Sequence, residues 1–194
     1  SVYAAHGYGP VLLAGAEIIR LLKTHRLEIN DSGLMLYSEG TAPLRTWKFS
    51  FGEGNAKTGY THIPGITSWS DEKGFALLAE KAPIPVTRKS KNGRTESFLT
   101  SDQPFGLVIS APEGRYEVTV TLGDPEGISE TTVKAESRRL MLENIKTSKG
   151  ETVQKKFVVD VRTPRITPTE QIRLKPRELN YLNWDHKLSL EFCG

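Results

Sequence analysis

The chain has 194 residues, of which 37% are hydrophobic and 25% are charged, and its formal net charge is +3. This ordinary globular composition allows one sizeable core with a piece left over. No apolar run approaches the roughly 20 residues that span a bilayer. Cys193 is the single cysteine, so an internal disulfide is excluded and cysteine usage does not indicate the redox compartment.

The N-terminal residues do not look like the start of a protein, because they lack an initiator Met, a basic region and a signal-peptide cleavage pattern. We therefore expect the chain to be a fragment of something larger. The stretch "PVLLAGAEIIRLLK", residues 10–23, has apolar residues near helical spacing and a proline suited to the first turn. This pattern predicts one amphipathic helix, which must pack on the rest of the chain or on a missing domain.

After residue 45 the hydrophobic pattern changes to period two. Apolar residues alternate with polar ones at 47–51, 116–122 and 187–192, which predicts half-buried strands. Turn signals such as "PEGR", "GDPEG", "SKG" and "TPRITP" separate them. Many short strands with no second helix predict an all-β, antiparallel two-sheet sandwich over residues 46–194. The polar segment 81–96 is expected to be a long surface excursion.

The sequence contains no catalytic constellation that we can identify. None of the four histidines has a motif around it, and "GDPEG" has Pro125 where the Gly-Asp-Ser block of SGNH hydrolases has its nucleophile. No P-loop or "GxGxxG" is present, and no His or Cys ligand spacing suggests a metal. We expect no cofactor, although Asp185 and Glu191 could supply oxygen ligands to a structural calcium; solvated carboxylates are the alternative.

Residues 47–192 resemble the β-sandwich domain that precedes the catalytic domain in bacterial rhamnogalacturonan acetylesterases of the SGNH type. This galactose-binding-like domain is related to family 35 carbohydrate-binding modules. The resemblance lies in "WKFSFGEG", "GYTHI", "GFAL", "FLTSDQPFGLVISAPEGRYEVTVTLGDP", "TTVKAESRRLMLENI", "FVVDVRTPRI", "RLKPREL" and "LNWDHKLSLEF". It implies a jelly-roll fold and a carbohydrate environment, while the esterase site would lie beyond Gly194.

The first residues, "AAHGYGPVLLAGAEIIRLLK", are similar to the last helix of family 105 glycoside hydrolases, the unsaturated rhamnogalacturonyl hydrolases. Together the two resemblances imply three parts: residues 1–26 as the C-terminal helix of a preceding catalytic domain, 27–45 as a linker, and 46–194 as the sandwich. They also imply an extracellular or periplasmic bacterial protein that degrades pectin.

We expect this chain to be a noncatalytic module that binds an acidic pectic saccharide or positions flanking catalytic domains. One alternative is a fragment of an active acetylesterase or glycosidase whose catalytic domain is elsewhere. Another is a structural spacer with no ligand. Residues 134–177 carry a net charge of +7, whereas the remainder carries −4, which favours an anionic partner. Nucleic acid ranks low, because the basic residues lack the stacking aromatics that such sheets use.

The adjacent Arg138 and Arg139 pose a problem, because neighbouring side chains on a strand point to opposite faces. They could read uronate carboxylates together with other arginines downstream, or they could be structural ties to nearby acids. A bulge at residues 137–139 would also solve the facing problem. The candidate carbohydrate-binding residues are Tyr60, Trp69, Arg138, Arg139, Arg162 and Arg165. Trp47 is expected in the core, whereas Tyr60 and Trp69 are expected to be stacking platforms.

Overall fold

The computed structural model describes residues 28–29, 35–36, 45–54, 58–89, 93, 95–178 and 182–194. These residues divide into two compact units, one within residues 1–44 and 165–171 and the other formed by 45–164 and 172–194. In the smaller unit, β1 (Glu28–Ile29) pairs antiparallel with β2 (Met35–Leu36). The predicted helix at residues 10–23 lies outside the described residues.

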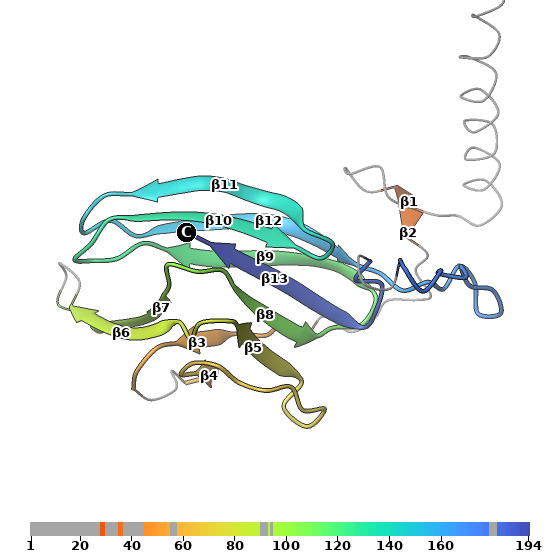
Figure 1. Ribbon diagram of the computed structural model, residues 1–194, viewed down its shortest axis with the longest axis horizontal. Coiled ribbons are helices and arrows are strands. Elements are labelled where there is room, and N and C mark those ends of the chain that lie inside the picture. Colours follow the sequence, from red (N-terminus) through yellow and green to blue (C-terminus); the bar gives the residue numbers. More distant parts are fainter. Residues whose placement is uncertain are drawn as a thin grey trace, which may run out of the picture. The chain divides into compact units, whose positions relative to one another are not determined.

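The larger unit is built from strands alone in its described part, as the period-two pattern predicts (Figure 1). Its strands are β3 (Phe49–Phe51), β4 (Thr61–Ile63), β5 (Phe75–Ala79), β6 (Ile84–Lys89), β7 (Thr95–Thr100), β8 (Phe105–Ser110), β9 (Gly114–Leu122), β10 (Ser129–Ala135), β11 (Arg139–Thr147), β12 (Val153–Val161) and β13 (Lys187–Cys193).

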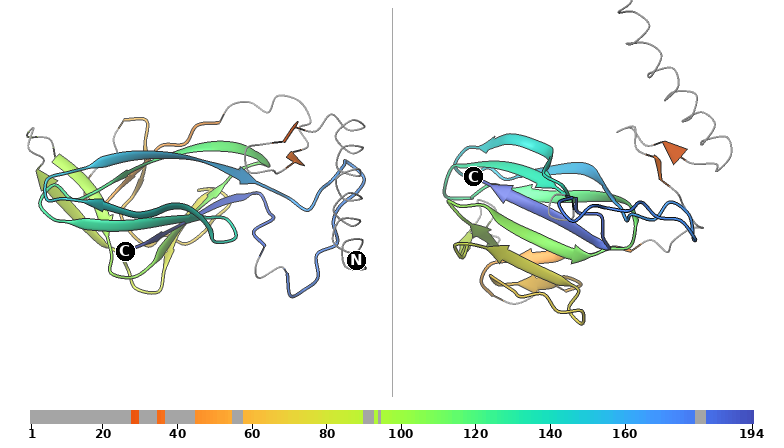
Figure 2. Two further views of the ribbon diagram at one scale, coloured as in Figure 1. Left: turned by 90° about the horizontal axis from the view of Figure 1, so that it is seen from above. Right: turned by 45° about the vertical axis from the view of Figure 1, so that its right-hand side comes forward.

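One layer is an antiparallel sheet of five strands in the order β11-β10-β13-β8-β5. The antiparallel pair β9–β12 runs across from this sheet (Figure 2). Two further pairs are β6–β7, which is antiparallel, and β3–β4, which is parallel. The all-β and mainly antiparallel prediction is confirmed. The segment 81–96, expected to be a long surface excursion, contains the mostly exposed strand β6 and the start of β7, which pairs with it. Pro85 lies in this two-stranded sheet, where a missing donor is tolerated.

The core lies between the five-stranded sheet and the β9–β12 pair. In-register partners share a face of an antiparallel sheet, so Leu77, Leu107 and Leu190 all point inward. They pack in one buried cluster with residues such as Val159 and Val161 of β12. Trp47, as predicted, packs against this cluster, where its ring lies 5.7 Å from that of Tyr116.

The turn between β10 and β11 explains the adjacent arginines. Glu136 and Arg138 have positive φ angles of 51° and 61°, so the chain reverses here in the left-handed region without a glycine. Arg138 is an exposed turn residue and Arg139 begins the next strand. The expected bulge at residues 137–139 is therefore wrong, because the segment is a hairpin turn. Leu140 pairs with Lys134 and Leu142 pairs with Val133, and the register shifts between these two pairs.

Candidate functional site

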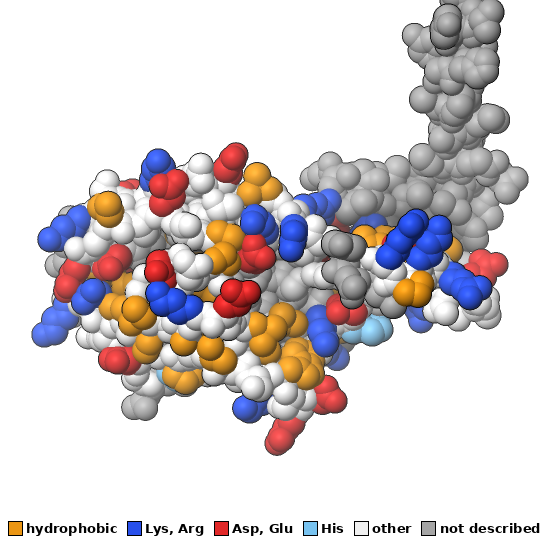
Figure 3. All heavy atoms as spheres, viewed as in Figure 1, with side chains coloured by type: hydrophobic (Ala, Val, Ile, Leu, Met, Phe, Trp, Pro, Cys, Tyr) orange, Lys and Arg blue, Asp and Glu red, His pale blue; other side chains and the backbone are white. Residues whose placement is uncertain are grey.

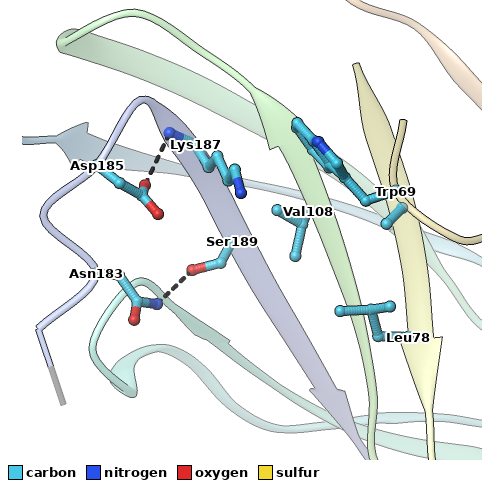
Figure 4. A pocket seen from close by; sticks show the side chains of 8 residues that line it. Trp69, Leu78, Val108, Asn183, Asp185, Lys187 and Ser189 are labelled. Atoms are coloured by element: carbon cyan, nitrogen blue, oxygen red, sulfur yellow. Dashed lines mark hydrogen bonds between the residues drawn. The ribbon is translucent and has the colours of Figure 1, made fainter. Parts of the chain in front are cut away.

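The outer face of the five-stranded sheet carries a pocket of about 260 Å³. One wall is apolar, formed by Trp69, Ala76, Leu78 and Val108, and the facing wall is polar, formed by Asn183, Asp185, Lys187 and Ser189 (Figure 4). On the same face, hydrophobic side chains gather where β5 and β8 lie, whereas charged side chains of both signs lie over β10 and β13 (Figure 3). The pocket thus joins an apolar surface to a polar one.

Trp69 reaches this face because the chain before β5 folds back on that strand. Thr67 exchanges two backbone hydrogen bonds of 3.0 Å with Leu77, and Gly74 N donates to Ser70 O at 2.9 Å. Trp69 Nε1 donates to Asp71 Oδ1 at 2.9 Å, which fixes the indole by its polar edge. Ala76 lines the pocket with Trp69 and is only 1% exposed. Trp69 is therefore held in place by its own loop.

The polar wall comes from β13 and the segment leading into it. Asn183 Nδ2 donates to Ser189 Oγ at 2.8 Å, and Lys187 N donates to Asp185 Oδ1 at 2.9 Å. The remaining oxygens, Asn183 Oδ1 and Asp185 Oδ2, accept no hydrogen bond from any residue that the structure describes. They are open acceptors at the pocket.

Lys187 crosses the pocket toward the apolar wall (Figure 4). Its Nζ lies 4.4 Å from the centroid of the Trp69 ring, within cation–π range. Within the described parts of the chain, this ammonium has no hydrogen-bond or ion-pair partner. The pocket therefore contains a cation with three unused donors.

The turn between β10 and β11 supports the polar wall from behind. Ser189 N donates to Glu136 Oε1 at 2.9 Å, and Asn183 N donates to Ser137 Oγ at 3.1 Å. Burial raises the pKa of Glu136 to about 7, and the charge of Asp185 acts in the same direction, while the hydrogen bonds from Ser189 oppose the shift. At neutral pH this carboxyl group is thus close to half-protonated.

Replacing Glu136 by Gln is expected to flatten the pH dependence of stability. The folded state holds the Glu136 proton up to about pH 7, whereas the unfolded chain releases it near its ordinary value, about 4.3 to 4.5. The ionised carboxyl therefore opposes folding, and stability falls as pH rises from about 4.5 to 7. The full difference in the pKa of Glu136 between the folded and unfolded chain corresponds to a loss of roughly 3 kcal/mol in the free energy of unfolding. Because the side chain is partly exposed, we expect a loss of about 1 to 2 kcal/mol.

Urea denaturation between pH 4 and 8 measures this effect. The Glu136→Gln variant should equal the wild type below pH 4.5 and exceed its stability at pH 8, since the amide oxygen can still accept from Ser189 N. A wild-type stability that rises between pH 5 and 7 through Glu136 would contradict the assignment.

Of the predicted site residues in the larger unit, only Trp69 lines the pocket. Arg138 lies on the adjoining turn, where its charge helps to lower the pKa of Glu191 after the larger effects of Lys134 and Cys193. Tyr60 is 41% exposed and belongs to the loop before β4, with Lys48 Nζ 5.8 Å from its ring centroid. Arg165 belongs to the smaller unit.

Arg139 and Arg162 lie near each other. Burial lowers the pKa of Arg162; the charge of Asp160 opposes this effect and that of Arg139 adds to it. Arg138 and Arg139 form no ion pair with another described side chain, so the predicted ties to nearby acids are not found there. Whether any of these arginines binds a ligand stays a prediction.

Several pocket residues were missed by the sequence reasoning: Asn183, Lys187, Ser189 and the supporting Glu136. Little in the local sequence indicates a site, because Lys187 and Ser189 occupy the polar positions of an alternating strand pattern. Asp185 was considered for calcium, but its Oδ1 accepts from the Lys187 backbone, and Glu191 Oε1 pairs with Lys134 Nζ at 2.9 Å. No group of three or more potential metal ligands is found in the described residues.

These observations define a class: an antiparallel β-sandwich with a pocket lined by Trp69 on one outer sheet face. The family model described as beta-agarase/YXIM esterase-like, galactose-binding domain-like matches residues 47–165, more than half of the chain. The chain belongs to this family. No curated protein and no solved structure matches it significantly. No helix in the described part of the chain is long and apolar enough to cross a membrane.

Proposed function

We propose that this chain is a noncatalytic carbohydrate-binding module whose ligand site is the Trp69 pocket. The observation that carries the proposal is the pairing of an exposed-face tryptophan with open hydrogen-bonding groups in one hollow of a galactose-binding-like domain. Sugar rings have an apolar face that packs on an indole, and their hydroxyl groups need donors and acceptors at the ring edge. The pocket offers both kinds of contact on facing walls.

The acceptors of the polar wall suit hydroxyl groups. Asn183 Oδ1 and Asp185 Oδ2 are open, and Ser189 Oγ is held at 2.8 Å from Asn183 Nδ2. These groups are positioned by backbone bonds to β13 and to the β10–β11 turn, so little side-chain freedom is lost when a ligand binds. At about 260 Å³ the hollow is smaller than the roughly 300 to 1,000 Å³ typical of drug-sized ligands. It therefore suits a single sugar ring.

The wider setting that we propose follows the sequence resemblance. The module would belong to a multidomain bacterial protein that degrades pectin, either extracellular or periplasmic, beside flanking catalytic domains of the same polypeptide. Its ligand would be an acidic pectic saccharide such as a rhamnogalacturonan fragment. The resemblance in "FLTSDQPFGLVISAPEGRYEVTVTLGDP" and "LNWDHKLSLEF" supports this setting.

Replacing Trp69 by Ala should weaken sugar binding by about 10- to 30-fold, because a buried aromatic anchor commonly contributes about 1.4 to 2 kcal/mol. Calorimetry of the full chain with D-galactose, D-galacturonate and short galactan and polygalacturonate oligosaccharides measures this loss. Tyr60→Ala is the matched control, since Tyr60 is an exposed aromatic that does not line the pocket. It should bind as the wild type does.

A loss of binding in Tyr60→Ala but not in Trp69→Ala would move the site to the loop before β4. Absence of binding to every one of these sugars would leave a structural spacer as the function. The melting temperature of each variant shows whether a loss of binding reflects a loss of fold.

A further inference from the structure

We propose that Lys187 is the specificity-determining residue of the pocket, and that it selects a sugar carrying a carboxylate over the neutral sugar of the same shape. This inference rests on the proposed function, because it takes the Trp69 pocket as the sugar site. In this proposal a lysine of β13 binds the carboxylate of the sugar, and the arginines do not.

The first support is the position of the ammonium. Lys187 lies on the outer face of β13, and its side chain extends across the pocket to place Nζ 4.4 Å from the Trp69 ring centroid (Figure 4). The ammonium therefore lies over a face of the indole that borders the pocket. A sugar ring that packs on this face displaces Nζ to the edge of the sugar, where the flexible lysine side chain can still reach an acidic substituent.

The second support is that the Lys187 ammonium has no hydrogen-bonding partner among the described residues, in contrast to that of Lys134, another lysine on the same sheet face. Lys134 Nζ pairs with Glu191 Oε1 at 2.9 Å and also contacts Cys193 Sγ at 3.6 Å. Lys187 Nζ has only the indole, among the residues that the structure describes. A cation–π contact at an exposed site is worth about 0.5 to 1 kcal/mol. A charge-assisted hydrogen bond to a carboxylate is stronger and would use the free donors.

The acids around the pocket weaken this attraction but do not remove it. Asp71 accepts from Trp69 Nε1, Asp185 from Lys187 N, and Glu136 from Ser189 N, so each already serves one structural bond. Burial raises the pKa of Glu136 to about 7, so part of its charge is absent at neutral pH. Arg138 on the adjoining turn adds a positive charge near this face, as its effect on Glu191 shows.

The test compares two ligands that differ at one carbon. D-galacturonate has a carboxylate where D-galactose has a hydroxymethyl group. We expect the wild-type chain to bind galacturonate about three- to tenfold more tightly at low salt, the value of one partly exposed charge pair. The preference should shrink at 0.5 M NaCl, since such pairs are screened.

Lys187→Met should bring galacturonate binding down to the level of galactose, so that the variant loses the three- to tenfold preference whatever the change in galactose binding itself. Lys187→Arg should keep the preference, because it keeps the charge. Lys134→Met is the matched control, a lysine on the same sheet face that is already paired and does not line the pocket; its preference should equal that of the wild type. If Lys187→Met does not fold, Lys187→Gln carries the same comparison.

The outcomes separate the two proposals. If the wild type binds galactose as tightly as galacturonate, or if Lys187→Met keeps the preference, Lys187 does not select the carboxylate. The Trp69 site stands as long as Trp69→Ala still weakens binding by about 10- to 30-fold. If the preference for galacturonate over galactose disappears in Lys134→Met instead, the carboxylate binds elsewhere on this sheet face. If neither sugar binds at millimolar concentration, both proposals fail.

Discussion

We expect the Gly52→Ala variant to unfold with a free energy about 3 to 4 kcal/mol below that of the wild type. Gly52 follows β3 with a φ of +91°, a region that L-residues other than glycine rarely adopt. A Cβ added there would lie 2.6 Å from Phe98 N and 2.7 Å from Phe98 O. Both atoms are backbone of β7, so no side-chain rotation can relieve the overlap. Backbone strain and overpacking each cost about 1 to 3 kcal/mol.

Gly54, two residues further on, provides a control that separates strain from overlap. Its φ of +102° is equally unfavourable for alanine, but a Cβ there would meet nothing within 4 Å. Gly54→Ala should therefore cost about 1 kcal/mol, from the backbone alone. Urea denaturation of both variants measures the difference. Equal losses at the two positions would show that the close approach of Gly52 to β7 does not limit stability.

Some strands of the fold could be predicted from the sequence, whereas some of the turns and strand pairings could not. The alternation at 116–122 and 187–192 identified β9 and β13, because a strand with one buried face repeats every two residues. The β10–β11 hairpin was not foreseen, since its turn places Glu136 and Arg138 in the left-handed region without the Gly or Asn that usually marks such a turn. The β3–β4 pair is parallel, which no local pattern indicates.

The candidate site was predictable only in part, for a related reason. Trp69 stood out because it lies in a loop of small polar residues, where a large ring is not easily buried. Its partners across the pocket, Asn183, Lys187 and Ser189, are more than 100 residues away in sequence and meet Trp69 only because β13 and β5 flank β8 in the sheet. Charge counting pointed to the arginines of residues 134–177, because it weighs the number of cations in a stretch of sequence and not where the fold places each one.

Substitutions at two adjacent leucines of β5 should separate effects on stability from effects on sugar binding. Leu77 is fully buried in the core cluster, whereas Leu78 points outward, is 50% exposed and lines the pocket. Leu77→Ala should lower the free energy of unfolding by about 3 to 4 kcal/mol, because it removes buried methyl groups and leaves a cavity between packed strands.

Leu78→Ala should cost less than about 1 kcal/mol of stability, because half of the side chain is already in water. It should nevertheless weaken the binding of D-galacturonate a few-fold, since it removes part of the apolar wall beside Trp69. Urea denaturation and calorimetry on the same two variants measure both effects. The opposite ranking would mean that the face carrying Leu78 is covered in the folded chain; the pocket beside Trp69 would then not be open to a sugar.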